Sequence, residues 1–170
     1  MDDTQNLSEE LENLHDEAFS WAMSVTRFDR DEAMDVLHDT YIKILDGRAT
    51  FSGRSAFKTW VFGVIRNTAR ERWRRRAVRS ALLLKFPPRP APVELPDHVA
   101  DQTGQKARIV AAINQLSDRQ REVVDLVFYH DLTVEEAAEV MGVGVGSART
   151  HYARAKDRLA QLLEDEREET

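Results

Sequence analysis

All five prolines of this 170-residue chain lie between Pro87 and Pro96. Proline fixes φ and has no amide hydrogen to donate, so this run cannot continue a helix from either side. It predicts an extended, proline-rich linker over residues 86–104, which separates a first domain (1–85) from a second (105–170). Helical periodicity recurs on both sides, and residues 1–85 show no strand pattern. The expected fold class is therefore all-α, with two small helical domains.

The net charge of −6 hides a strong segregation of charge. Residues 1–46 carry three Lys and Arg against 13 Asp and Glu, a net −10, whereas residues 47–85 carry 11 against one, a net +10. Charged helix faces that are merely solvated could give such runs. A swing of this size between neighbouring stretches favours a basic surface for phosphate and an acidic surface for a basic protein partner.

The composition narrows the function classes further. Cysteine is absent, which is typical of a reducing cytoplasm and excludes a disulfide scaffold or a thiol redox switch. The chain has no run of about 18 apolar residues for a membrane span, and its amino terminus is acidic, unlike a signal peptide. The five histidines are far apart in the sequence, so we expect no metal site, no cofactor and no enzyme activity. The absence of cysteine leads us to expect a cytoplasmic location.

In the first domain, apolar spacing predicts a helix over residues 7–27, with Ser8 as its N-cap, and a second helix over residues 29–45. A mixed acidic and apolar face runs along the second helix, spaced by three and four residues. It consists of Asp35, His38, Asp39 and Ile42. A docking face for another protein and a solvated surface with one stray Ile remain equally open.

A loop is predicted over residues 47–55, where glycines and arginines surround Phe51. The helix that follows, from about residue 56 into the seventies, has an expected buried stripe of Phe57, Trp60, Val61, Val64, Ala69 and Trp73. Its other face offers cations near an aromatic ring and an amide: Lys58, Arg66, Arg70, Arg72 and Arg74, with Phe62 and Asn67. Cations follow a phosphate backbone, and aromatic and amide groups bind unpaired bases, so this combination predicts single-stranded nucleic-acid binding.

In the second domain the helical period resumes at residue 105, and two capping boxes follow, Ser117 with Gln120 and Thr133 with Glu136. The first opens a helix expected to bury Val123, Val124 and Val127. The second opens a helix over residues 134–141, which Gly142 ends. A turn over residues 143–146 then leads into a basic helix.

A short helix, a glycine-containing turn and a basic helix form a helix-turn-helix pattern, although a generic helical hairpin is the alternative. Arg149, Thr150 and His151 lie near the start of the second helix, where base edges are read. Arg154 and Arg158 suit phosphates, as do the backbone amides of Gly146 and Ser147.

Two long motifs, taken together, resemble a bacterial RNA polymerase sigma factor of the extracytoplasmic-function group of the sigma-70 family. Residues 31–45 (DEAMDVLHDTYIKIL) and 51–76 resemble its region 2, and residues 113–159 resemble its region 4. The rivals are a stand-alone helix-turn-helix regulator, which would need a receiver domain with strands, an enzyme, and an adaptor that binds only proteins.

The resemblance implies roles for the residues. Asp35, His38, Asp39 and Ile42 match the surface that docks on the β′ clamp helices of core RNA polymerase. The loop around Phe51 and the helix with Asn67 match the pocket that captures a flipped base of the minus-ten element. The residues expected to bind minus-ten DNA are Arg48, Phe51, Lys58, Phe62, Arg66, Asn67, Arg70 and Arg74. Arg149, Thr150, His151 and Arg154 match the readers of the minus-thirty-five element, and the residues expected to bind that DNA are Gly146, Ser147, Arg149, Thr150, His151, Arg154 and Arg158. Other implied partners are the β flap, promoter DNA and a regulatory anti-sigma factor, with no small-molecule substrate. The linker would thread towards the polymerase active-site cleft.

Overall fold

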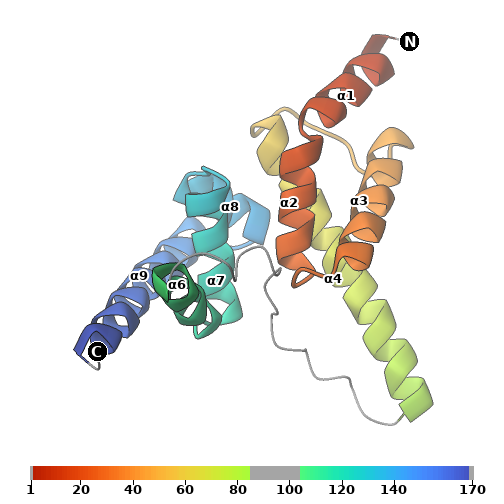
Figure 1. The fold of residues 1–170 in the computed structure, drawn as a ribbon. Helices are drawn as coiled ribbons and strands as arrows, with labels where there is room; N and C mark the ends of the chain where they lie inside the picture. Colours follow the sequence, from red (N-terminus) through yellow and green to blue (C-terminus); the bar gives the residue numbers. More distant parts are fainter. Residues whose placement is uncertain (1, 85–103, 169–170) are drawn as a thin grey trace. The chain divides into compact units, whose positions relative to one another are not determined.

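The computed structural model describes residues 2–84 and 104–168, and all the regular structure in those ranges is helical. The expected all-α fold class is confirmed. The chain divides into two compact units, Met1–Pro92 and Val93–Thr170, and each is described by itself (Figure 1). The division falls within the segment expected to be a proline-rich linker, of which residues 86–103 lie outside the described residues.

The described part of the first unit contains α1 (Asp2–Asn13), α2 (His15–Val25), α3 (Arg30–Leu45) and α4 (Phe57–Leu84). The single helix expected over residues 7–27 is wrong, because ψ is −5° at Leu14 instead of the helical value near −42°, and Ser8 lies inside α1. This break lets α1 pack against α3 while α2 packs against both α3 and α4. The helix expected over residues 29–45 is confirmed, and Asp29 caps it by accepting from the Glu32 amide at 3.0 Å.

Trp21 joins α2 to α4 in the core of the first unit. Its fully buried ring stacks on Phe62, with 5.7 Å between the ring centroids and 8° between the planes. Its Nε1–H donates to the Phe62 carbonyl oxygen at 3.0 Å. A buried indole N–H needs such an acceptor, so the contact fixes the position of α4 along α2.

α4 extends well past the other helices of its unit (Figure 1). It has 28 residues against 16 in α3, so the two helices are about 42 Å and about 24 Å long. Its fully buried apolar residues, Val61, Phe62 and Ile65, lie in its first half. Trp73 lies further along and is 56% exposed, so its expected place in the buried stripe is wrong.

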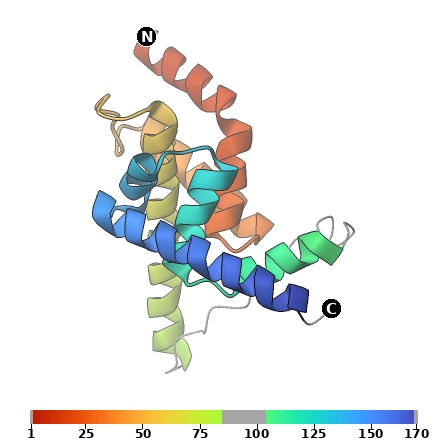
Figure 2. The same cartoon turned by 90° about the vertical axis from the view of Figure 1, so that its left-hand side faces the viewer.

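The described part of the second unit contains α6 (Gly104–Asn114), α7 (Asp118–Val124), the π-helical turn η1 (Asp125–Tyr129), α8 (Val134–Met141) and α9 (Val145–Glu168). α9 packs against α6, α7 and α8 (Figure 2). Both expected capping boxes are confirmed, at the starts of α7 and α8. Gly142 ends α8 with φ of 65°, the left-handed conformation expected of a glycine there.

Two details of the second unit differ from expectation. The turn η1 follows Val124 and shifts the helical register, so Leu126 is buried while Val127, expected in the core, is half-buried. The turn before the last helix is shorter than residues 143–146, because α9 already begins at Val145. Among the described helices, none combines the length and the apolar character needed to cross a membrane.

Trp21→Phe is expected to lower the free energy of unfolding by about 1–3 kcal/mol, because it leaves a gap in the core and removes the donor to the Phe62 carbonyl. Trp73→Phe is the matched control at an exposed position, with an expected change within about 0.5 kcal/mol. Urea denaturation followed by far-UV circular dichroism measures both variants. Equal losses in the two would contradict the core assignment.

Candidate functional site

Arg72 of α4 draws three carboxylates of α3 together. Its Nε donates to Glu32 Oε1 at 2.9 Å, its Nη2 to Asp35 Oδ2 at 2.7 Å and its Nη1 to Asp39 Oδ2 at 2.6 Å. The hydrogen bond with Glu32 is the largest cause that raises the pKa of Arg72 above its ordinary value. Arg76 also pairs with Glu32. These contacts tie the acidic face of α3 to the basic face of α4.

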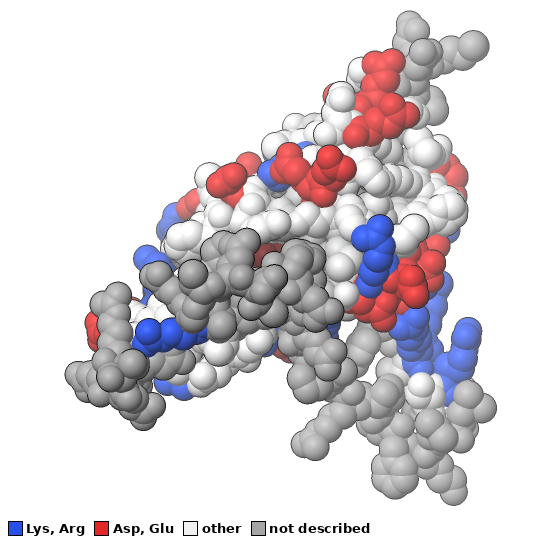
Figure 3. Space-filling view, viewed as in Figure 1, with Lys and Arg blue, Asp and Glu red and all other residues white. Residues whose placement is uncertain are grey.

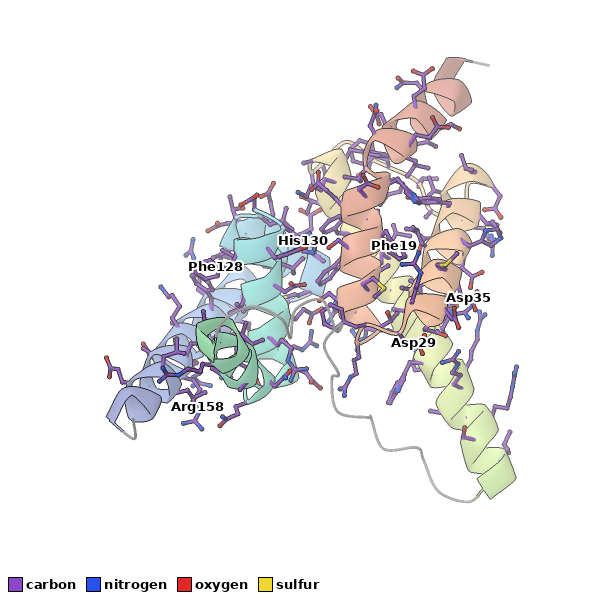
Figure 4. All side chains as sticks on the ribbon, viewed as in Figure 1. Phe19, Asp29, Asp35, Phe128, His130 and Arg158 are labelled. Carbon is purple, nitrogen blue, oxygen red and sulfur yellow. The ribbon has the colours of Figure 1, made fainter. Side chains whose placement is uncertain are left out.

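The four residues expected to form a docking face lie on one side of α3, where the spacing had placed them. The side chains of Asp35 and Asp39 remain 62% and 38% exposed although both pair with Arg72, and Ile42 is 41% exposed. His38 is exposed as well. Figure 4 labels Asp35 on α3, beside α4. The sequence pattern missed Arg72 as a member of this surface, because it had placed that residue among the cations that face nucleic acid.

Lys43 and Glu71 make a second link between α3 and α4. Lys43 Nζ donates to Glu71 Oε2 at 2.6 Å and to Thr68 Oγ1 at 3.1 Å, and Arg75 donates to the other Glu71 oxygen at 2.9 Å. The hydrogen bond from Lys43 is the main reason that the pKa of the Glu71 carboxyl is lowered. The acidic and basic stretches of the sequence thus partly neutralise each other, and Figure 3 shows acidic and basic side chains side by side on this unit.

The residues of α4 expected to face nucleic acid divide into an exposed and a buried set. Asn67, Arg70 and Arg74 are exposed. Phe62 and Arg66 are buried, 0% and 5% exposed, so the expectation that their side chains lie on a nucleic-acid surface is wrong. The physical reason is the Trp21 contact, which turns this part of α4 into the core.

Lys58, also expected at that surface, is half-buried. It pairs with Glu17 of α2, and its Nζ lies over the Phe62 ring, 5.6 Å from the centroid. The Lys58 charge is therefore partly neutralised by a carboxylate of a neighbouring helix.

Phe51 belongs to an aromatic cluster in the loop between α3 and α4. Its ring centroid lies 5.5 Å from that of Phe57 and 5.2 Å from that of Trp60, yet it stays 40% exposed. Phe51 and Trp60 line a shallow hollow of about 480 Å³, and Asn67 is not among the lining residues. Asn67 lies about 10 Å beyond Trp60 along α4, so the structure does not bring Phe51 and Asn67 into one pocket. Arg48 is exposed, and its Nε donates to Asp46 Oδ2 at 2.7 Å.

In the second unit, α9 carries the expected base-reading residues on its first turns. Gly146 and Ser147 are exposed near its start, and His151 is half-buried. Arg149, Thr150, Arg154 and Arg158 are all exposed. The Thr150 hydroxyl donates to the Gly146 carbonyl oxygen at 2.9 Å, within the helix itself. Figure 4 labels Arg158 further along α9.

Arg149 pairs with Glu135, a residue near the start of α8 that the sequence patterns did not single out. The Arg149 Nη2 donates to Glu135 Oε1 at 2.6 Å. This bond is the largest cause that lowers the pKa of the Glu135 carboxyl. The partners are 14 positions apart, across the turn between two helices, so helical spacing alone could not reveal the pair.

Sequence reasoning also missed an exposed aromatic group that begins within the π-helical turn η1. Phe128 and Tyr129 are 64% and 69% exposed, and the Phe128 ring lies 6.0 Å from that of Tyr152 (Figure 4). Lys156 Nζ lies 4.7 Å from the Tyr152 ring centroid. Within residues 2–84 and 104–168, no group of three or more His, Asp or Glu side chains is placed to hold a metal ion.

Comparison with known proteins gives two family matches, in the order of the two units. The model described as Sigma-70 region 2 matches residues 11–79, and the one described as Sigma-70, region 4 matches residues 106–159. The ECF RNA polymerase sigma factor SigX of Bacillus subtilis is 30% identical over 146 residues, which cover 83% of this chain and 75% of the relative. The RNA polymerase sigma factor YlaC of the same organism is 26% identical over 142 residues, 82% of each protein.

A solved structure extends the likeness to the fold. It contains the sigma factor RpoE from Bartonella quintana in complex with the anti-sigma factor NepR, and it matches with a TM-score of 0.73 and 26% identity over 94% of this chain and 98% of that chain. The present chain belongs to the sigma-70 family, in the extracytoplasmic-function group of RNA polymerase sigma factors.

Arg72→Met is expected to lower the free energy of unfolding of the first unit by about 1–3 kcal/mol, because it leaves three neighbouring carboxylates without their shared cation. Arg72→Lys should recover only part of the loss, since an ammonium cannot bind three carboxylates with a planar fork of donors. The first unit contains all three tryptophans, so their fluorescence during urea denaturation reports on it selectively.

The matched control is Arg70→Met, which removes the same charge from an exposed position of the same helix. Its expected effect is within about 0.5 kcal/mol. If the two Met variants unfolded at the same urea concentration, Arg72 would have no special structural role.

Proposed function

We propose that this sigma factor binds core RNA polymerase and gives it promoter specificity through a division of labour between its units. Members of the family direct transcription initiation, and this chain shares that general role. The first unit would dock on the polymerase and trap an unpaired base, and the second would read duplex DNA. The observation that carries the proposal is the exposure of cations on α4 and α9, one helix in each matched region.

The proposed docking surface consists of Asp35, His38, Asp39 and Ile42, and its proposed acceptor is the pair of β′ clamp helices. The support is physical: an exposed apolar side chain lies beside carboxylates that Arg72 keeps in fixed positions. An apolar anchor with oriented charges around it is the usual arrangement of a protein interface. For the second unit the proposed polymerase contact is the β flap.

The proposed minus-ten surface consists of Arg48, Phe51, Lys58, Asn67, Arg70 and Arg74, without the buried Phe62 and Arg66. Flipping a base out of the duplex costs a few kcal/mol, and stacking on an aromatic ring returns about 1–3 kcal/mol. The exposed rings of Phe51 and Trp73 are the candidates for such stacking. Phosphate contacts by the arginines of the protruding half of α4 would add to the stability of the opened strand.

For the minus-thirty-five element, the proposed reader is the helix-turn-helix of α8 and α9. Arg149 and His151 would contact base edges, and Thr150 would offer its methyl group, because its hydroxyl proton is engaged with Gly146. The amides at Gly146 and Ser147 and the side chains of Arg154 and Arg158 would bind phosphates.

An anti-sigma factor is a further proposed partner. The support is the Bartonella quintana sigma factor, which matches this chain over 94% of its length and whose solved structure includes an anti-sigma factor. Binding of that kind would compete with polymerase if it covered the surface of α3.

Co-purification of the chain with core RNA polymerase, followed by run-off transcription on genomic fragments, tests the proposal. Discrete products that core polymerase alone does not make are the expected result. A stand-alone regulator would bind DNA without joining the polymerase, and an adaptor protein would give no promoter-dependent products.

Ile42→Asp is expected to weaken binding to core polymerase at least about tenfold, because it places a charge in a desolvated contact. Ile42 suits this test better than Asp39, whose bond with Arg72 makes its substitution affect folding as well. Met34→Asp on the same helix, at a residue that is 53% exposed and outside the proposed surface, is the control. Fluorescence anisotropy of labelled protein measures both; an unchanged Kd for Ile42→Asp would exclude this docking surface.

Asn67→Ala is expected to reduce promoter melting at least about fivefold while recruitment stays normal, since it removes an exposed contact to the unpaired strand. Permanganate reactivity of promoter thymines measures melting. A template with a preformed bubble supplies the control, because it should restore transcription by the variant. Normal melting on the duplex would remove Asn67 from the base-trapping surface.

A further inference from the structure

The ion pair between Glu135 and Arg149 lies on the face of the second unit that the proposed function assigns to promoter DNA. Its two side chains are 54% and 66% exposed, and Arg149 lies near the start of α9. Glu135 lies in the first turn of α8, between Thr133 and Glu136, the two residues of the capping box that fixes that turn. The carboxylate therefore has a well-defined backbone position from which to orient the guanidinium.

The bond between them leaves Arg149 able to read a base. It uses Nη2, whereas a guanidinium carries five N–H donors in a rigid fork. A bidentate contact with guanine needs two donors at a fixed angle, so an arginine whose rotation is restrained by a carboxylate loses less conformational freedom when it binds. The pair thus fits an arginine held in a reading orientation.

The charge of Glu135 argues against a role in general DNA affinity. The first helix of a helix-turn-helix crosses the DNA backbone, where a carboxylate repels phosphates. Glu136, its neighbour, is accounted for by the capping box, and Glu139 lies exposed one turn later. A carboxylate at Glu135 would weaken binding to every sequence alike, unless its bond with Arg149 favours one base pair over the others.

We propose that Glu135 is a positioning residue that determines sequence specificity, because its carboxylate holds the Arg149 guanidinium in the orientation that reads a base pair of the upstream element. The inference rests on the proposed function of α9 and adds a residue on α8 to it. Under this proposal, the Glu135 carboxylate lowers the affinity for DNA of every sequence and raises the preference for one base pair over the others.

The test uses the full chain, alone and bound to core RNA polymerase. A pool of DNA duplexes with a randomised central segment is selected on the wild-type protein. Affinities are then measured for the selected duplex and for a scrambled one across a salt series. The variants are Glu135→Ala, Glu139→Ala as the matched removal of one carboxylate from α8, Arg149→Ala, and Glu135→Ala combined with Arg149→Ala. Circular dichroism checks that each variant is folded.

Glu135→Ala is expected to lower the ratio of the affinity for the selected duplex to that for the scrambled duplex about two- to fivefold, which is the scale of an exposed ion pair. The same variant should bind the scrambled duplex no more weakly than the wild-type protein does. Glu139→Ala should keep the wild-type ratio. Arg149→Ala should lower the ratio about fivefold or more, and adding Glu135→Ala to it should lower the ratio no further, since the coupling acts through Arg149.

Each failure has a distinct signature. If no duplex were selected, or if Arg149→Ala kept the full ratio, base reading by α9 would be wrong and the inference would fall with it. If Arg149→Ala lost the ratio while Glu135→Ala kept or raised it, base reading would stand and Glu135 would be only a surface ion pair.

Discussion

The bond network around Arg72 is the interaction on which the first unit depends. Glu32, Asp35 and Asp39 share one face of α3, where carboxylates so close together would repel one another without a cation between them. A planar guanidinium donates to all three from nitrogens spread over a rigid fork, whereas an ammonium would have to reach all three from a single nitrogen. The Trp21 contact sets the position of α4 along α2, and with it the position of Arg72 against α3. Core packing thus orients the carboxylates proposed to meet the polymerase, before any partner arrives.

The same network changes what the charge segregation means. The acidic and basic stretches of the sequence suggest two separate binding surfaces, yet Arg72, Arg76 and Lys43 each pair across the interface between α3 and α4. Part of the segregation therefore stabilises the fold. Among the cations of α4, Arg70 and Arg74 are exposed and so face solvent, which leaves them available for phosphate.

Local features of the sequence predicted the local features of the fold. The capping boxes at Ser117 and Thr133 and the glycine that ends α8 act within a few residues, so the sequence pattern contains all that determines them. Features that depend on tertiary partners were missed. Helical spacing shows which residues share a face but not which face packs, so Phe62 was assigned to a binding surface and Trp73 to the core. Helical spacing also missed the π-helical turn that begins at Asp125, because this turn shifts the helical register and leaves Val127 half-buried.

The two units also differ in how many donors their key arginines commit to the protein. Arg72 donates from Nε, Nη1 and Nη2 to three carboxylates, which makes it a structural residue although it lies in the most basic run of the sequence. Arg149 donates from Nη2 to one carboxylate, and its guanidinium remains largely exposed. Arg72 therefore commits three of its five N–H donors, at least one from each nitrogen, to its own fold, whereas Arg149 is restrained through a single nitrogen and keeps most of its fork of donors in a fixed direction. The number of committed donors, rather than position in a basic stretch, therefore distinguishes Arg72, which stabilises the fold, from Arg149, which is proposed to read DNA.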